Sequence, residues 1–303
     1  MKTIDLHIHT NCSDGAHSPF EVLDISKQYE LSAISIADHD TISAYTESLF
    51  TYADDLEIEL IPAVEISTLD NEGRKYHILG YGIDLTSILL NEKFDQLNQD
   101  RINNAIEVAK LLEKDKWTID IENILSKGAT LTKGTIGRAV VKHPQNITSL
   151  KELFGYQPTE DEFVEKFLIK DKKYYVKYPN KIQAVEAIEL IHNSGGIAIH
   201  AHPFGNIHKG DKIEDLIDRL TNWGIDGFEA IAVGFDTAEE GKEIEYRKEI
   251  EEICIKRNLI VTGGSDFHSR DPKVADKYVD VGFHNHRWSI PYSILENLKK
   301  HMN

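Results

Sequence analysis

The chain of 303 residues contains only two cysteines, Cys12 and Cys254. Two cysteines so far apart in the sequence do not indicate a disulfide framework or a zinc site built from thiolates. Any metal ion that this chain binds must therefore be held by nitrogen and oxygen atoms.

Long apolar runs are also missing, because no stretch approaches the ~20 residues that a membrane helix needs. Near the N-terminus, Asp5, His7 and His9 interrupt the apolar residues, which is not typical of a signal peptide. We therefore expect a cytoplasmic protein without a membrane partner. Hydrophobic residues make up 41% of the chain and charged residues 28%, as in an ordinary globular protein. The length of 303 residues suits either a large single-core α/β domain or a domain with an insertion.

Basic residues are too few to balance the acidic ones, so that the net charge is −17. Affinity for long nucleic acid depends largely on lysines and arginines that displace counterions from the phosphates. The composition therefore disfavours long nucleic acid as a partner, although bound divalent cations can reverse the sign of the field within a site. The sequence gives no indication of the oligomeric state.

The stretch from Ile4 to Gly15 contains the first candidate site. Its alternating start predicts a strand, in which His7 and His9 share one face while the intervening apolar residues pack on the other. The polar turn that follows could present Asp14 beside the two rings. A lone pair of histidines at this spacing is as often structural or exposed as it is a metal half-site, so the rest of the chain decides.

Strand-like and helix-like segments alternate along much of the chain, which is typical of a parallel α/β fold. A capping box at 18–21 predicts the first helix. Later strands are expected at 31–37, 60–66, 75–82, 197–199, 226–230 and 259–262. Six segments place His, Asp or Glu at or just after a strand, and active sites in barrel-like parallel folds gather at the carboxyl ends of strands. Chance rarely produces so many coincidences.

The segment from 87 to 180 departs from this pattern. Apolar residues at helical spacing predict helix from about 87 to 126, and helical or loop segments continue to about Pro179. We therefore predict a discontinuous catalytic domain, residues 1–86 and 181–303, with a mostly helical insertion between its two parts.

Five ordered motifs closely resemble those of the PHP (polymerase and histidinol phosphatase) family, in its branch of nucleotide phosphatases and exonuclease-like enzymes. They are Asp-Leu-His-Ile-His-Thr with Ser-Asp-Gly, Ala-Asp-His-Asp, Glu65 with His77, Gly-Gly-Ile-Ala-Ile-His-Ala-His-Pro, and Gly-Ser-Asp-Phe-His. The resemblance implies a distorted (β/α)7 TIM-like barrel that holds three divalent ions.

Carried over to this chain, the resemblance assigns nine ligands to the three ions. The first ion would be held by His7, His9, Glu65 and Asp266, the second by Glu65, His77 and His202, and the third by Asp14, His39 and His268. Glu65 would bridge the first two ions. Histidine and carboxylate without thiolate suit Mn, Zn or Fe. Nearby carboxylates would either orient the imidazoles or serve as turn and solvent residues: Asp5, Asp38 and Asp40.

Outside the nine ligands, three residues have expected roles. Related sequences usually have Thr-Arg-Pro-His before a further arginine in the insertion, and only the last arginine, Arg138, is retained here. We expect Arg138, and secondarily Lys133, to contact a phosphate, the alternative being cations at a helix start. His200 stands where an aliphatic residue is common, and we expect it to assist catalysis beside Glu65 and Asp266, as an acid–base group or as a support for the ligands.

The resemblance implies a phosphoesterase that hydrolyses a small phosphate monoester, by first expectation a nucleotide, through metal-activated hydroxide at a trinuclear site. Three ions against three carboxylates would leave the site positive and attract a phosphate, and metal ions lower the pKa of a bound water. The insertion would close over the barrel mouth. The alternatives are a 5′–3′ exonuclease on short oligonucleotides, a C–N or C–O hydrolase, and a non-catalytic metal-stabilised interaction domain.

Overall fold

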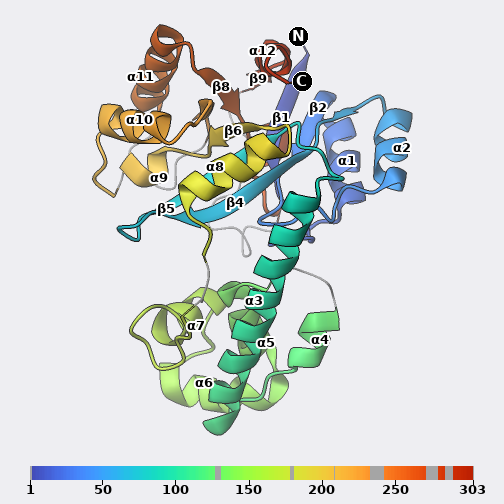
Figure 1. The fold of residues 1–303 in the computed structure, drawn as a ribbon. Coiled ribbons are helices and arrows are strands. Elements are labelled where there is room, and N and C mark those ends of the chain that lie inside the picture. The colour runs from blue at the N-terminus through green and yellow to red at the C-terminus, as the bar shows by residue number, and fades with distance from the viewer. Residues whose placement is uncertain are drawn as a thin grey trace. The chain divides into compact units, whose positions relative to one another are not determined.

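The chain forms two compact units in the computed structural model (Figure 1). The described residues are 2–126, 131–177, 181–207, 209–232, 242–270, 279–283 and 289–302. The first unit joins Met1–Glu92 to Ile182–Asn303, and the second is Lys93–Lys181. The predicted assignment of 1–86 and 181–303 to a catalytic domain, with 87–180 as its cap, stays a prediction.

The first sheet of the first unit has the strand order β3-β2-β1-β9. β1 (Thr3–Ile8), β2 (Leu31–Ile36) and β3 (Glu59–Leu60) are parallel, and β9 (Ile290–Pro291) is antiparallel to β1. The helices α1 (Pro19–Gln28) and α2 (Glu47–Asp55) connect these strands. The predicted capping box is confirmed at the start of α1, where the Ser18 N–H donates to the Glu21 carboxylate over 2.7 Å.

The second sheet has the order β4-β5-β6-β7-β8. Its strands are β4 (Ala63–Leu69), β5 (Lys75–Tyr81), β6 (Ile197–His200), β7 (Gly227–Ile231) and β8 (Ile260–Gly263). The α/β class is confirmed, but the sheet is mixed because β5 is antiparallel to both β4 and β6. Only a short turn separates β4 from β5, and parallel neighbours need a longer crossover.

The first unit contains further helical segments after β5. They are α8 (Ala184–Asn193), α9 (Phe204–Ile207), α10 (Ile213–Asn222), α11 (Lys242–Arg257), α12 (Ser293–Lys299) and the 3-10 turn η3 (Val281–Phe283). Within the described residues no helix is both long and apolar enough to cross a membrane. The expected cytoplasmic location stays a prediction.

Single bridges link the two sheets at the ends of their strands. Ile8 pairs with Phe267 and His39 pairs with Glu65, both in the parallel sense. At the first junction the Asp266 N–H donates to the His7 carbonyl over 2.9 Å. The strand pairing thus describes two sheets joined by isolated bridges, and the closed barrel stays a prediction.

β1 is buried on both of its faces. Ile4 and Leu6 belong to one apolar core of the unit, whereas Asp5, His7 and His9 lie on the other face and are fully buried as well. Buried polar groups are costly unless they find partners inside the protein. The alternation in β1 therefore places a polar cluster inside the first unit.

The regular secondary structure described in the second unit consists of helices. α3 (Ile88–Lys114) begins in the first unit, and α4 (Ile121–Ser126), α5 (Lys133–Lys142), η1 (Pro144–Asn146), α6 (Ile147–Phe154) and α7 (Glu160–Phe167) follow. The unit has an apolar core of its own, which includes Leu112, Val140 and Phe163. An independent core is typical of a separate folding unit.

Candidate metal centre

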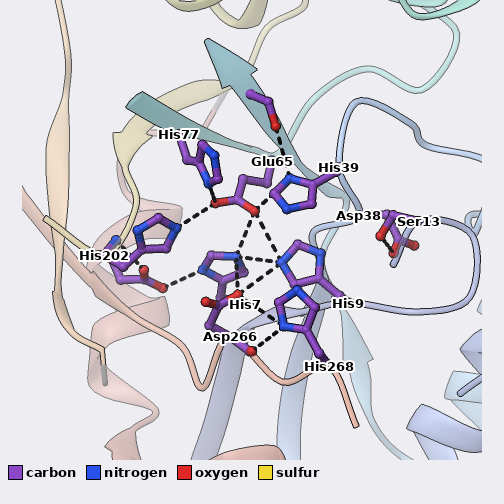
Figure 2. A network of polar contacts seen from close by, with 12 residues as sticks. His7, His9, Ser13, Asp38, His39, Glu65, His77, His202, Asp266 and His268 are labelled. Carbon is purple, nitrogen blue, oxygen red and sulfur yellow. Dashed lines mark hydrogen bonds and ion pairs between the residues drawn. The ribbon is translucent and has the colours of Figure 1, made fainter. Parts of the chain in front are cut away.

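Side chains from several strand ends meet in one cluster of imidazoles and carboxylates (Figure 2). β1 and the turn after it supply His7, His9 and Asp14; the segment after β2 supplies His39; β4 supplies Glu65; β5 supplies His77; and the segments after β6 and β8 supply His202, Asp266 and His268. The structure thus brings all nine predicted ligands together.

Glu65 lies at the middle of this cluster and is fully buried. Its Oε1 atom is 3.0 Å from Nδ1 of His77 and 3.0 Å from Nε2 of His202. Its Oε2 atom is 3.0 Å from Nδ1 of His39 and 3.2 Å from Nε2 of His9. The two oxygens therefore face different rings, as a carboxylate that bridges two ions must do.

A second meeting point joins β1 to the segment after β8. The Nε2 atoms of His7 and His9 are 3.1 Å apart, and the nearer carboxylate oxygen of Asp266 is 3.1 Å from the His9 atom. Asp266 adopts a positive φ of 53°, a conformation that is uncommon for residues other than glycine. The backbone is thus bent where the carboxylate enters the cluster.

A third set of contacts surrounds Asp14. Its carboxylate lies 3.5 Å from Nε2 of His268 and 3.7 Å from both His9 and His39. The side chains of Asp14 and His268 are about a third exposed, whereas His9 is fully buried. The cluster is therefore open to solvent on the side of Asp14 and His268.

In the part of the chain that the structure describes, ligand atoms within 4.8 Å of one another define three groups. They are His7 with His9, Glu65 and Asp266; His39 with Glu65 and His77; and His9 with Asp14, His39 and His268. The first and third groups contain the ligands that the resemblance implied for two of the ions. In the second group His39 accompanies Glu65 and His77, while His202 reaches the same Glu65 oxygen as His77.

Two atoms inside the cluster show that these residues fit a cation. Nδ1 of His9 and Oε2 of Glu65 are buried and accept or donate no hydrogen bond. A buried polar atom without a hydrogen bond is costly, and a metal ion would satisfy both atoms. The nitrogen and oxygen donors suit Mn, Zn and Fe. The identity of the ion stays a prediction.

The charges of the cluster are strongly coupled. Burial opposes the charged form of Glu65, but His39, His77 and His7 hold its pKa well below the usual range. Burial also opposes protonation of His9, yet its contacts with Asp266 and Glu65 raise its pKa to about 10. Burial lowers the pKa of His39 to about 3. In the metal-free protein His9 therefore carries a proton that a metal ion would have to displace.

Asp5 and Asp38 hold backbone rather than imidazole rings. Asp38 accepts hydrogen bonds from the Thr10 N–H (2.7 Å) and the Ser13 hydroxyl (2.5 Å). Asp5 accepts the Ser265 N–H over 2.9 Å, and burial raises the pKa of Asp5 to about 6. These carboxylates fix the segments that follow β1 and β8. The sequence suggested instead that they would orient the imidazoles or serve as turn and solvent residues.

One polar residue of the cluster was missed by the sequence analysis. Glu229, in β7, is fully buried and lies 3.0 Å from Nδ1 of His7. Its other oxygen accepts the His202 N–H over 2.8 Å. The only available signal was a carboxylate within an otherwise apolar strand, which does not by itself identify a partner.

His200 lies outside the three ligand groups. Its fully buried ring packs beside Tyr76 and Phe228, and Nδ1 is 3.2 Å from the His77 carbonyl oxygen. Burial lowers the pKa of His200 to about 3, so the ring is neutral at neutral pH. This placement does not favour proton donation by an imidazolium, and the catalytic role of His200 stays a prediction.

The predicted phosphate contacts are both in α5 of the second unit. Arg138 forms a two-pronged ion pair with Glu160, with N–O distances of 2.7 and 2.9 Å. Lys133 lies 4.9 Å from the centre of the Tyr175 ring. Their role toward a phosphate stays a prediction.

Comparison with known proteins identifies the class of this metal centre. The sequence pattern of the PHP domain matches residues 5–227. The chain therefore belongs to the PHP domain family. It is a metal-dependent phosphoesterase, a hydrolase of phosphoester bonds.

Several characterised relatives cover most of the chain. The 5′-3′ exoribonuclease of Haemophilus influenzae is 31% identical over 88% of this chain and 90% of its own length. The phosphoribosyl 1,2-cyclic phosphate 1,2-diphosphodiesterase of Eggerthella lenta is 24% identical over 89% of this chain and 95% of its own length. The 3′,5′-nucleoside bisphosphate phosphatase of Chromobacterium violaceum is 25% identical over 89% of this chain and 88% of its own length. These relatives share the bond type but differ in substrate.

A solved structure from Bifidobacterium adolescentis, described as a metal-dependent phosphoesterase, has the same fold. Its TM-score is 0.75 at 21% identity, and the match covers 100% of this chain and 97% of the other. At this level of identity the likeness concerns the fold alone.

Proposed function

We propose that this protein hydrolyses a phosphate ester of a nucleotide at a centre of three divalent cations. The position of Glu65 carries the proposal, because its two oxygens face separate sets of imidazoles at 3.0–3.2 Å. The nine proposed ligands of the three cations are His7, His9, Asp14, His39, Glu65, His77, His202, Asp266 and His268.

The proposed roles follow from burial and charge. Divalent cations supply a water of lowered pKa and neutralise charge on phosphoryl oxygens when they are bound. Glu65 and Asp266, whose pKa values are held low by the surrounding histidines despite burial, remain ionised and offset the cation charge. Asp14 and His268 lie at the exposed side of the cluster, where a phosphate has access.

We further propose that the two sheets together make the distorted seven-stranded barrel. The bridges Ile8–Phe267 and His39–Glu65 support this, because they join β1 to the segment after β8 and the segment after β2 to β4. The ring would run β1, β2, β4, β5, β6, β7, β8 and back to β1. His7, His9, Asp266 and His268 flank the first bridge, and His39 and Glu65 form the second.

A second candidate is 5′-3′ hydrolysis of short RNA. The relative that is 31% identical is named a 5′-3′ exoribonuclease, which favours this activity over a nucleoside bisphosphatase at 25% identity. The net charge of −17 argues against a long polymer, because few cations are available to displace counterions. A short oligonucleotide and a mononucleotide both remain compatible with the proposed centre.

Activity measurements on metal-loaded protein test the proposal. The protein is reconstituted with Mn²⁺ or Zn²⁺ and given a nucleoside 3′,5′-bisphosphate, a 5′-phosphorylated short RNA and a cyclic phosphate diester. We expect phosphate release from the mononucleotide, or mononucleotide release from the RNA if the second candidate is correct. Hydrolysis of none of these by protein with a full metal content would contradict the proposal.

A further inference from the structure

Glu229 joins two of the proposed ligands from a position that no ligand group includes. One oxygen of its carboxylate lies 3.0 Å from Nδ1 of His7, and the other accepts the N–H of His202 over 2.8 Å. Glu229 and His7 are both fully buried. A buried carboxylate is costly unless it is paired, and these two contacts pair both oxygens of Glu229.

The first contact determines which nitrogen of His7 faces the cluster. A carboxylate at 3.0 Å from Nδ1 only accepts, so Nδ1 carries the proton. In the neutral ring Nε2 then has the free lone pair, and this atom lies 3.1 Å from Nε2 of His9 and 3.4 Å from Glu65. Carboxylates that accept from a ligating histidine orient the ring and raise its basicity.

The second contact holds an unusual stretch of backbone. His202 follows the end of β6 and has a positive φ of 28°, which is strained for a residue with a side chain. Its N–H donates to Glu229, while its Nε2 lies 3.0 Å from Oε1 of Glu65. Strained backbone persists only where surrounding contacts hold it, and Glu229 provides such a contact from the neighbouring strand.

We propose that Glu229 is a positioning residue of the metal centre, which sets the tautomer and angle of His7 and fixes the His202 backbone through one carboxylate. This inference rests on the proposed function, because it requires that His7 and His202 bind cations. Glu229 itself contacts neither substrate nor, by this proposal, the ions.

The chain offers a matched control at the opposite end of the same two strands. The carboxylate of Asp226, just before β7, accepts the Ala198 N–H of β6 over 2.8 Å. It also lies 2.7 Å from Nε2 of His192. Asp226 thus makes the same kinds of contact as Glu229, to a backbone N–H and an imidazole, with no proposed ligand involved.

The test measures Mn²⁺ bound per chain at set concentrations of free Mn²⁺ in wild type, Glu229→Gln, Glu229→Asp and Asp226→Asn. An amide cannot accept on both sides, so we expect Glu229→Gln to weaken the ions held by His7 and His202 about 10–100-fold. The ion at Asp14, His39 and His268 should stay near its wild-type affinity, and Asp226→Asn should match wild type throughout. Circular dichroism and thermal melting report the fold.

The outcomes separate this inference from the proposed function. Wild-type metal affinity in Glu229→Gln overturns the inference, and so does an equal loss of all ions, which indicates a general structural role. If Glu229→Gln does not fold, Glu229→Asp decides, because the shorter side chain keeps the charge but cannot span both contacts. Unchanged affinity in Glu229→Asp would then overturn the inference. A wild-type protein that binds none of Mn²⁺, Zn²⁺ and Fe²⁺ refutes the proposed function itself.

Discussion

Glu65 is the residue at which most contacts of the cluster meet, so its replacement is the strongest single-residue test. Glu65→Gln keeps the shape but removes the charge and one acceptor oxygen. We expect bound metal to fall and hydrolysis to drop more than about 100-fold, because electrostatic stabilisation of charge is lost. Metal analysis and phosphate release measure the two effects.

The control for this variant is Glu59→Gln. Glu59, in β3, accepts from the Tyr292 hydroxyl over 2.7 Å and pairs with Lys299, away from the predicted ligands. It should keep its metal and its activity. Full metal content and activity in Glu65→Gln would show that this carboxylate bridges nothing.

Protonation of His9 predicts how metal affinity depends on pH. The contacts with Asp266 and Glu65 outweigh burial and raise its pKa to about 10, so a cation displaces a proton from His9 at neutral pH. Affinity should therefore increase with pH below about 10, roughly tenfold per unit for each proton released. Titration calorimetry in buffers of different ionisation enthalpy counts the protons, and a pH-independent affinity would contradict this protonation.

Arg138 tests the expected role of α5. If its guanidinium contacts the phosphate, Arg138→Ala should raise KM about 10-fold or more with a smaller effect on kcat, as expected for loss of a charge-assisted hydrogen bond. Glu160→Gln is the paired control, because it removes the partner of Arg138 and leaves the cation in place. Equal changes in thermal stability with an unchanged KM in both variants would assign Arg138 to the ion pair alone.

The sequence predicted which nine side chains lie together in the cluster but did not predict Glu229, for a physical reason. His7 and His9 share a face because strands have a period of two, and motifs at strand ends predict that distant segments meet. The contacts of Glu229 with His7 and His202 depend on which segments lie beside β7, and this is a property of tertiary structure. Likewise, the sequence around Asp5 and Asp38 does not indicate whether their carboxylates accept hydrogen bonds from imidazole rings or from backbone N–H groups.

At the scale of elements, the close approach of β1 to the segment after β8 brings His7 beside Asp266. Gly264 makes this possible, because a Cβ atom there would lie 2.1 Å from Cβ of His7 and 2.6 Å from its backbone nitrogen. Neither neighbour is a flexible side-chain end. The strands would have to separate to admit a methyl group.

Gly264→Ala should therefore destabilise the fold by about 1–3 kcal/mol and weaken metal binding. The matched control is Gly134→Ala in α5, where the nearest atom to an added Cβ is 3.4 Å away and alanine favours the helix. Thermal melting and metal content compare the two variants. A Gly264→Ala protein that melts and binds like wild type would contradict the close approach.

The start of α1 and most strands were predictable from sequence, whereas the break between α3 and α4 and the strand direction were not. The Ser18–Glu21 capping box is a local signal and was confirmed. The antiparallel β5 arises because a short turn follows β4, and periodicity reports burial without reporting direction. The bridges at Ile8 and His39 join segments that are far apart in the sequence, which no local pattern encodes.

At the scale of the whole molecule, the net charge predicts how hydrolysis would depend on substrate length if short RNA, the second candidate, is the substrate. Because the net charge is −17, the affinity of the protein for an oligonucleotide should not increase once the oligonucleotide is longer than the nucleotides that reach the centre. We expect kcat/KM for 5′-phosphorylated RNA to be flat or to fall from short to long substrates. A steep gain with length, lost at high salt, would instead indicate an extended basic binding surface.

The most direct test of the account is a titration of metal-free protein with Mn²⁺ that follows bound ion and phosphoester hydrolysis in the same sample. The account predicts saturable binding of up to three ions per chain, with hydrolysis that rises as they bind and is lost on chelation. Hydrolysis that persists without bound metal, or a protein that binds no stoichiometric metal, would contradict it.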